Sequence, residues 1–277
     1  MAVDWAATEA MSRGVGLRLV AAFLPPTGGT GFGFGAFFSP DALDDLLARA
    51  DSALDVERRA IAERFPDLDV TADIVVSSPA AALVDASEEA CLTVVGSRGM
   101  GGFRGLLIGS VGIQVATHAH SPTVVLRGIP EASATDVVVG VDGSPLSARA
   151  LEFAFGIASR RGWRLIAVHA YEVASYDALM VPTAAPLEQP ANAEADERRV
   201  VAEALAGFAE RYPDVDVEPS TIKGPSVRSL VDAAQDAALL VVGSHGRGEF
   251  LGALLGSVSQ GVLHRATVPV AVVGAPQ

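Results

Sequence analysis

Two glycine-rich stretches of the sequence have the residue types and spacing of an anion-binding site. Residues 241–258 read VVGSHGRGEFLGALLGSV, where Gly243 and Gly246 follow a short apolar run and Gly256 and Ser257 open a helical pattern. Glycine lets the backbone approach a ligand closely, and free N–H groups at a helix N-terminus attract phosphate. The pattern therefore predicts a phosphate-binding loop between a buried strand and a helix.

The same pattern occurs in the first half of the chain, where Gly96 and Gly109 stand 147 positions earlier (243 − 96 and 256 − 109). Residues 65–70 (FPDLDV) match residues 212–217 (YPDVDV) at the same displacement. A single glycine pattern would be weak evidence for a site. Its repetition at a fixed displacement indicates a tandem duplication of one α/β unit.

Helices and strands must alternate along the chain to position these motifs. Short β-branched runs bounded by glycine indicate buried parallel strands, and apolar stripes at helical spacing indicate helices. We expect strands over residues 17–23, 69–76, 92–95, 123–126, 137–141, 164–170, 216–222, 238–242 and 270–273. We expect helices over residues 5–12, 41–65, 80–90, 110–119, 145–159, 192–211 and 226–237, and another beginning at 256–257. This alternation predicts doubly wound parallel sheets that bind ligands beyond the carboxyl ends of their strands.

The two halves differ at one point, because the strand at 137–141 and the following Asp142 have no counterpart in the first half. Phe23 aligns with His169, a displacement of 146 (169 − 23), which places the equivalent of Asp142 before Met1. If that strand is central, its loss should cost most of the domain's stability, because its neighbours lose ladder partners. We expect that the start of the chain is misassigned or that the chain is truncated. The alternative is that another segment takes the place of the missing strand.

Composition excludes several classes of partner. The length of 277 residues suits two domains, which we place at 1–129 and 134–277, and 50% hydrophobic with 19% charged residues is typical of a globular protein. The formal charge of −13 argues against nucleic acid and anionic membranes as partners. The single cysteine, Cys91, excludes an internal disulfide, and no apolar run approaches the ~18 residues of a membrane span. Without a signal-peptide pattern, we expect a soluble cytoplasmic protein.

Residues 138–144 (VVGVDGS), together with G-x2-G-x9-G-S in both halves, resemble the universal stress protein family along essentially the whole chain. The resemblance implies two tandem Rossmann-like domains, each a five-stranded parallel sheet of order 3-2-1-4-5, with the N-terminal central strand missing from the first. It also implies that the last strands, at 123–126 and 270–273, pair the domains about a pseudo-twofold axis. The two domains would thus form an intramolecular pseudo-dimer, and a homodimer of two chains is left open.

The glycine motif marks the members of this family that bind ATP, so the resemblance implies ATP, with Mg²⁺, as the cofactor. Carried over to the second half, it implies an adenosine side of Gly140, Val141, Asp142 and Ala170, ribose and phosphate contacts from Val242, Gly243, His245 and Gly246, and a phosphate cradle of Gly256, Ser257, Val258 and Ser259. The matching first-half residues are Val95, Gly96, Arg98, Gly99, Gly109, Ser110 and Val111, without the aspartate. The intact site is therefore expected in the second half.

Plainer interpretations of the same residues stay open. Each glycine turn could simply pack a strand against a helix, Asp142 could cap the helix that follows it, and His245 could face solvent. No metal site is predicted, because three of the five histidines lack metal-ligand spacing with other His, Cys or acidic residues: His118, His120 and His264.

The leading functional hypothesis is ATP binding without efficient chemistry, in a stress-response module whose occupied state is read by a protein partner. The phosphate motif has no Gly-Lys-Ser/Thr lysine, no paired carboxylates for two metals and no evident base to activate water. Slow hydrolysis of bound ATP in the presence of Mg²⁺ is left open. The alternative is a nucleotide-independent protein-interaction module, and a third class is an enzyme whose turnover would depend on Asp142.

Overall fold

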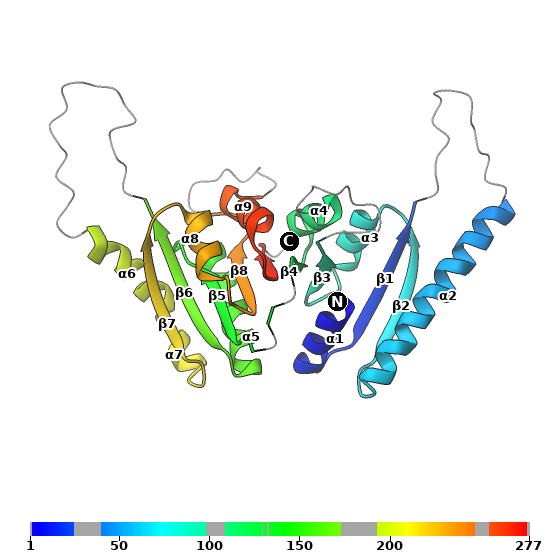
Figure 1. The fold of residues 1–277 in the computed structure, drawn as a ribbon, viewed down its shortest axis with the longest axis horizontal. Helices are drawn as coiled ribbons and strands as arrows, with labels where there is room; N and C mark the ends of the chain where they lie inside the picture. The colour runs from blue at the N-terminus through cyan, green and yellow to red at the C-terminus, as the bar shows by residue number, and fades with distance from the viewer. Residues whose placement is uncertain are drawn as a thin grey trace, which may run out of the picture.

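The computed structural model describes residues 2–24, 40–97, 109–128, 130–131, 133–172, 193–246 and 255–275, in which helices and strands alternate (Figure 1). The strands are β1 (Leu17–Phe23), β2 (Val70–Val76), β3 (Thr93–Gly96), β4 (Thr123–Leu126), β5 (Asp136–Gly140), β6 (Arg164–Tyr171), β7 (Val217–Lys223), β8 (Leu239–Gly243) and β9 (Val270–Val273). The helices are α1 (Ala2–Arg13), α2 (Pro40–Arg64), α3 (Pro79–Ala86), α4 (Ser110–His118), α5 (Pro145–Arg161), α6 (Ala193–Leu205), α7 (Phe208–Arg211), α8 (Ser226–Ala233) and α9 (Ser257–Arg265).

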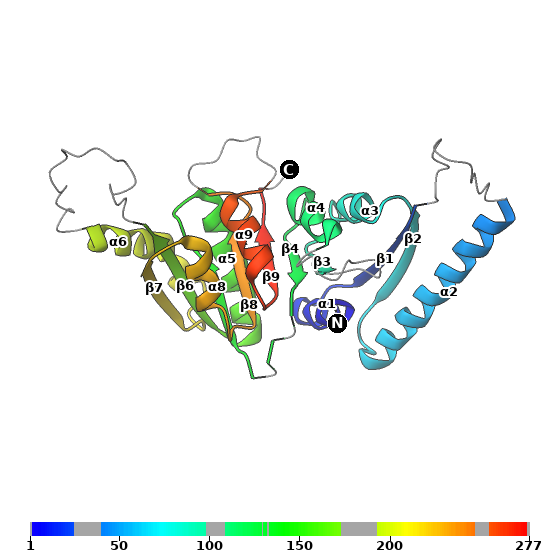
Figure 2. The ribbon, with the colours of Figure 1, turned by 45° about the horizontal axis from the view of Figure 1, so that its top comes forward.

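The second half forms a parallel five-stranded arrangement in the order β7-β6-β5-β8-β9, which confirms the expected order 3-2-1-4-5. Its central strand, β5, lies between β6 and β8, and Val137, Val138 and Val139 are fully buried there. Such a run of β-branched residues is typical of a strand covered on both faces. Figure 2 shows α8 and α9 on one face of this sheet and α5 on the other.

The two halves join into one sheet of seven strands, because β4 pairs with β9 in the antiparallel sense. Val124 lies opposite Ala271 in this pair, and both are fully buried. The guanidinium of Arg127 then donates to the carbonyls of His264 (2.9 Å) and Ala266 (3.2 Å), at the end of α9. The expected pairing of the last strands is therefore confirmed.

In the described part of the first half, no strand occupies the central position that β5 has in the second half. Among the described residues, β1 pairs with β2 alone, and β3, paired with β4, ends the seven-stranded sheet. No described strand lies between β1 and β3. Within the described residues, the expected lack of a central strand in this domain is confirmed.

The repeat runs at a displacement of 148 around β1, and not the expected 146. Leu17 begins the pairing of β1 with β2, and Leu165 begins the pairing of β6 with β7. Gly14 follows α1 with a left-handed φ of 65°, and Gly162 follows α5 with a left-handed φ of 63°. Phe23 therefore corresponds to the last residue of β6, and not to His169.

The helix expected over residues 192–211 is broken into α6 and α7. Gly207, between them, has a left-handed φ of 81°, which interrupts the helical run. The break turns Phe208 onto Phe155, so that their rings stack with centroids 4.7 Å apart. This contact covers the α5 side of the core.

A buried ion cluster connects α1 of the first half to α5 of the second. The carboxylate of Glu9, which is 1% exposed, lies 2.7 Å from Arg13, 2.8 Å from Arg161 and 3.4 Å from Arg160. Burial raises the pKa of Glu9, but the hydrogen bonds from Arg161 and Arg13 outweigh that effect and the net pKa is lowered. The carboxylate is therefore ionised and holds three cations together.

Within the described residues, no helix combines the length with the apolar character that crossing a bilayer demands.

Candidate functional site

A pocket of about 360 Å³ opens at the carboxyl ends of β5, β6 and β8, beside the N-terminus of α9. This is the edge at which parallel α/β sheets bind ligands. All twelve residues predicted for the second-half site line it: Gly140, Val141, Asp142, Ala170, Val242, Gly243, His245, Gly246, Gly256, Ser257, Val258 and Ser259. The structure thus brings the twelve residues together, and their binding of a nucleotide stays a prediction.

Asp142 organises the turn between β5 and α5. Its Oδ1 accepts a hydrogen bond from the Ser144 N–H (2.9 Å), while the Ser144 hydroxyl accepts one from the Ser147 N–H (3.1 Å). Ser144 is therefore the N-cap of α5, and Asp142 holds the turn that precedes it. The plainer interpretation, in which Asp142 itself caps this helix, is wrong.

The loops after β5 and β8 approach each other closely at Gly246. A Cβ atom added to Gly246 would lie 2.8 Å from Oδ2 of Asp142, so the carboxylate of Asp142 would have to shift. Gly243 is similarly crowded, with a Cβ position 3.2 Å from the backbone carbon of Leu146. Both glycines of the motif therefore leave backbone, and not side chains, against the pocket.

Hydrogen bonds close the two ends of the segment between β8 and α9. The Ser244 N–H donates to Val273 (2.8 Å), the Gly256 N–H donates to the Ser244 carbonyl (2.7 Å), and the Ser259 hydroxyl donates to the Gly243 carbonyl (2.5 Å). Ser259, predicted to cradle phosphate, thus uses its hydroxyl hydrogen to fix the end of β8.

The N-terminus of α9 faces the pocket without a side-chain cap. Gly256 is its N-cap residue and supplies no side-chain hydrogen bond to the helix. The first N–H groups of a helix have no acceptor within it, and they carry partial positive charge. An anion in the pocket would meet this charge.

Five further residues shape the pocket and were missed by the sequence analysis. Four of them line it: Ser147, Val168, Ser226 and Leu230. The fifth, His169, is buried, with Nδ1 2.7 Å from the Val141 carbonyl and Nε2 2.7 Å from Glu197. It ties the lining residue Val141 to α6. A buried histidine near the end of an apolar strand was the one signal in the sequence for it.

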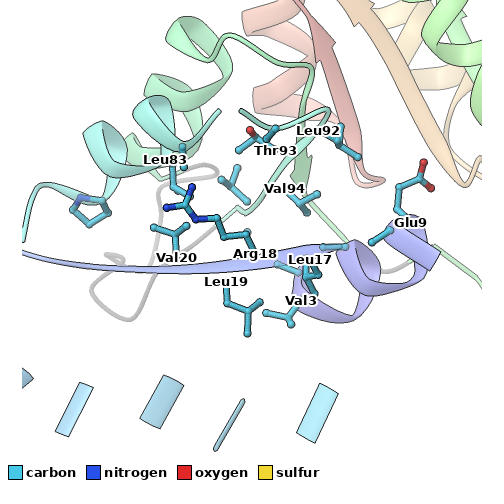
Figure 3. Close-up of a pocket in the computed structure, with 18 of the residues that line it drawn as sticks. Val3, Glu9, Leu17, Arg18, Leu19, Val20, Leu83, Leu92, Thr93 and Val94 are labelled. Atoms are coloured by element: carbon cyan, nitrogen blue, oxygen red, sulfur yellow. The ribbon is translucent and has the colours of Figure 1, made fainter. Parts of the chain in front are cut away.

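The described first-half motif residues line a different and wider cavity of about 1140 Å³, between β1 and β3 (Figure 3). Its backbone frame repeats that of the second half, because the Gly109 N–H donates to Ser97 (2.8 Å) and the Ser97 N–H donates to Leu126 (3.0 Å). The wall that β5 and Asp142 supply in the second half is missing here. Five predicted residues line this cavity, Val95, Gly96, Gly109, Ser110 and Val111, whereas Arg98 and Gly99 lie outside the described residues.

The smaller pocket is lined mainly by backbone and small or apolar side chains. Asp142 and His245 are the only titratable side chains among its described lining residues. Across the described ranges of the chain, no three His, Cys, Asp or Glu side chains are grouped so as to hold a metal ion.

Comparison with known proteins gives a consistent result for the whole chain. The sequence model of the universal stress protein family matches residues 1–127 and 134–274. A universal stress protein of Mycobacterium tuberculosis is 35% identical over 100% of this chain and 91% of its own length, and one of Mycolicibacterium smegmatis is 37% identical over 98% and 92%. The crystal structure of a universal stress protein from Archaeoglobus fulgidus shares the fold, with a TM-score of 0.67 at 21% identity over 98% of this chain and 90% of that one. The chain therefore belongs to the universal stress protein family.

Proposed function

We propose that this stress-response protein binds ATP with Mg²⁺ in the second-half pocket and hydrolyses it slowly or not at all. One observation carries the proposal. The ends of three strands and the N-terminus of α9 form a single pocket, which all twelve residues implied by the family resemblance line. Its volume of about 360 Å³ lies within the usual range for ligand sites, roughly 300–1000 Å³.

Each wall of the pocket suits one part of the nucleotide. The N-terminus of α9 offers N–H groups to phosphate oxygens, and Gly246 leaves the backbone room to approach them. The carboxylate of Asp142 can accept a hydrogen bond from a ribose hydroxyl. Leu230 and Val168 give an apolar surface for the base. A bound Mg²⁺ would add positive charge beside the phosphates.

Slow hydrolysis follows from the side chains that line the pocket. Asp142 is the single carboxylate among the described lining residues, and its Oδ1 is already engaged by the Ser144 N–H. Efficient phosphoryl transfer uses several charged groups to position the attacking water and stabilise the transferred phosphoryl group. We therefore propose that the bound nucleotide acts as a signal, and that a protein partner recognises the occupied state.

The decisive experiment is isothermal titration of ATP and Mg²⁺ into the wild-type chain and an Asp142→Asn variant. Asparagine keeps an oxygen for the Ser144 N–H, so the turn survives while the charge is removed. A lost charge-assisted hydrogen bond is worth about 1.5–3 kcal/mol, and we expect the affinity to fall roughly 10- to 100-fold. Asp136→Asn, at the opposite end of β5, is the matched control and should bind ATP like the wild type.

Nucleotide content separates this proposal from the nucleotide-independent interaction module. The chain purified without added ligand is denatured, and the released molecules are identified by mass spectrometry. Bound adenine nucleotide supports the proposal and shows whether ATP or another adenine nucleotide is preferred. Absence of nucleotide, together with no binding on titration of ATP or cyclic AMP, would favour the interaction module. Equal affinity of the wild type and the Asp142→Asn variant would instead remove Asp142 from the site.

A further inference from the structure

His169 lies on β6 between two residues that line the second-half pocket, Val168 and Ala170, but it is not itself a lining residue. Successive side chains of a strand point to opposite faces of the sheet, so the ring of His169 points away from the pocket, toward the face on which α6 packs (Figure 1). The residue is 5% exposed. A buried polar ring thus stands directly behind the wall of the pocket.

Both ring nitrogens of His169 face oxygen atoms. Nδ1 lies 2.7 Å from the carbonyl oxygen of Val141, which can only accept, so the Nδ1–H is the donor. Nε2 lies 2.7 Å from Oε2 of Glu197, and one hydrogen must lie between these two atoms, because a nitrogen lone pair would repel those of the oxygen. The ring is therefore a bridge with one end on the residue that follows β5 and the other on α6.

Val141 is held through both of its main-chain groups. Its N–H donates to the Val168 carbonyl at 2.8 Å, and its carbonyl accepts from the ring of His169. The next residue is Asp142, which is the one carboxylate among the described lining residues of the pocket. Val141, His169 and Glu197 thus form a continuous path of short contacts that leads from the pocket to α6.

Glu197 is the point at which the beginning of α6 is attached to the sheet. Residues 194–196 are exposed, Glu197 is half-buried, and Val201 is fully buried in the core. Glu197 and Val201 stand four positions apart, so they lie on the same face of the helix. The hydrogen bond to His169 therefore decides whether the first described turn of α6 is docked on β6.

The first half has no such pair at the corresponding positions, although it repeats the strand and the helix. β1 runs at a displacement of 148, so Ala21 stands where His169 stands in β6. α2 ends at the residues that match at a displacement of 147, so Ala50 stands in place of Glu197. Both elements form with alanine at these positions. The pair is therefore not a requirement of the fold, and it belongs to the half whose pocket has an aspartate.

We propose that His169 is a positioning residue, which couples nucleotide occupancy of the second-half pocket to the docking of α6 through Glu197. The inference rests on the proposed function, because it assigns to α6 the signal that bound ATP produces. A nucleotide that contacts Asp142 restrains this residue and, with it, the Val141 carbonyl that His169 holds. The docked helix in turn keeps this carbonyl in place for the nucleotide, since a coupling between two sites is reciprocal.

Amide hydrogen exchange of the full chain measures this coupling. With saturating ATP and Mg²⁺, exchange over residues 194–201 of the wild type should slow by about fivefold or more, the lower end of typical coupling between two sites. The Glu197→Ala variant should still bind ATP, with an affinity weaker by a similar factor, but its α6 should no longer respond. Because this variant is also measured at saturation, the comparison removes the general stabilisation that any bound ligand gives.

Two further variants distinguish this role from a merely structural one. Glu197→Gln keeps both hydrogen bonds, because the glutamine amide donates to Nε2 of a neutral His169 while the Nδ1–H still donates to Val141. It should retain the response of α6 and the ATP affinity of the wild type. Glu194→Ala removes an exposed carboxylate, paired with Arg198, from the same helix one turn earlier. It is the matched control and should also behave like the wild type.

The outcomes separate this inference from the proposed function. If titration detects ATP binding but α6 exchange in the wild type is unchanged, the coupling is refuted and the nucleotide site stands; this measurement needs no substitution. An equal response of α6 in the wild type and in Glu197→Ala would refute it as well. A response lost in Glu197→Gln as fully as in Glu197→Ala would overturn the role of the hydrogen-bonded bridge. If ATP does not bind at all, the proposed function and the coupling both fall.

Discussion

The contact between α1 and α5 depends on one buried carboxylate, so Glu9→Gln should destabilise the association of the two halves. Three guanidinium groups, those of Arg13, Arg160 and Arg161, lie within 3.4 Å of this carboxylate. Burial and the charge of Arg13 already lower the pKa of Arg160. Removing the negative charge leaves three cations that repel one another in a site with little water.

The expected loss is about 3 kcal/mol of unfolding free energy. Removing one partner of a buried ion pair typically costs about 3–5 kcal/mol, and the lower end applies because the glutamine oxygen can still accept one hydrogen bond. The cluster has no spare acceptors, since in the described part of the chain Arg13 Nη2 and Arg161 Nε are buried without a hydrogen-bond partner. Glu152→Gln, at an exposed pair with Arg211, is the matched control and should change stability by less than about 0.5 kcal/mol.

Urea denaturation followed by tryptophan fluorescence measures the difference, because Trp5 lies on α1 and Trp163 lies under Arg161. The pKa of Glu9 is lowered from 4.5, so its contribution is fully present above that pH and is lost as the pH falls through the folded-state value. The difference in unfolding free energy between the wild type and the Glu9→Gln variant should therefore have its full value at pH 7 and decrease below pH 4.5. Equal stability at pH 7, or a gap that widens in acid, would refute this reasoning.

Three further substitutions test how the elements pack. Gly261→Ala places a Cβ 2.7 Å from Val227 and should separate α8 from α9, at a cost of about 1–3 kcal/mol in thermal denaturation that outweighs the gain in helix propensity. Gly128→Ala places a Cβ against the backbone carbonyl of Thr267, so hydrogen exchange in β4 should accelerate as its pairing with β9 loosens. Arg127→Met removes two hydrogen bonds to the last carbonyls of α9 and should lower the denaturation midpoint by the equivalent of about 1–2 kcal/mol. An unchanged denaturation midpoint for Gly261→Ala or Arg127→Met, or unchanged exchange for Gly128→Ala, would count against the corresponding contact.

Much of the second half could be predicted from the sequence, because its signals are local. The bounds of β4 and β9 are those expected, since each is a short apolar run that follows a proline. The twelve site residues that the family resemblance implied line one pocket, because they follow the ends of neighbouring parallel strands or begin α9. The resemblance to a known family, and not the residue pattern alone, supplied the strand order.

The remaining features depend on contacts between segments that are distant in the sequence. The break at Gly207 was missed because apolar residues continue at helical spacing on both sides of it. The role of His169 became visible only when β5 and α6 were placed beside it. The repeat predicts that residues 1–129 include no counterpart of β5, but only the structure shows that β1 and β3 stay apart and border a cavity.

The antiparallel pairing of β4 with β9 has a consequence for how the two halves can diverge. Because both strands belong to one chain and a short connection links β4 to β5, their effective concentration is high and the pairing does not change with dilution. In a dimer of identical subunits, a substitution that alters one site alters both. Here each half carries its own substitutions, so the pocket of one half and the cavity of the other can diverge while the β4–β9 pairing holds the halves together.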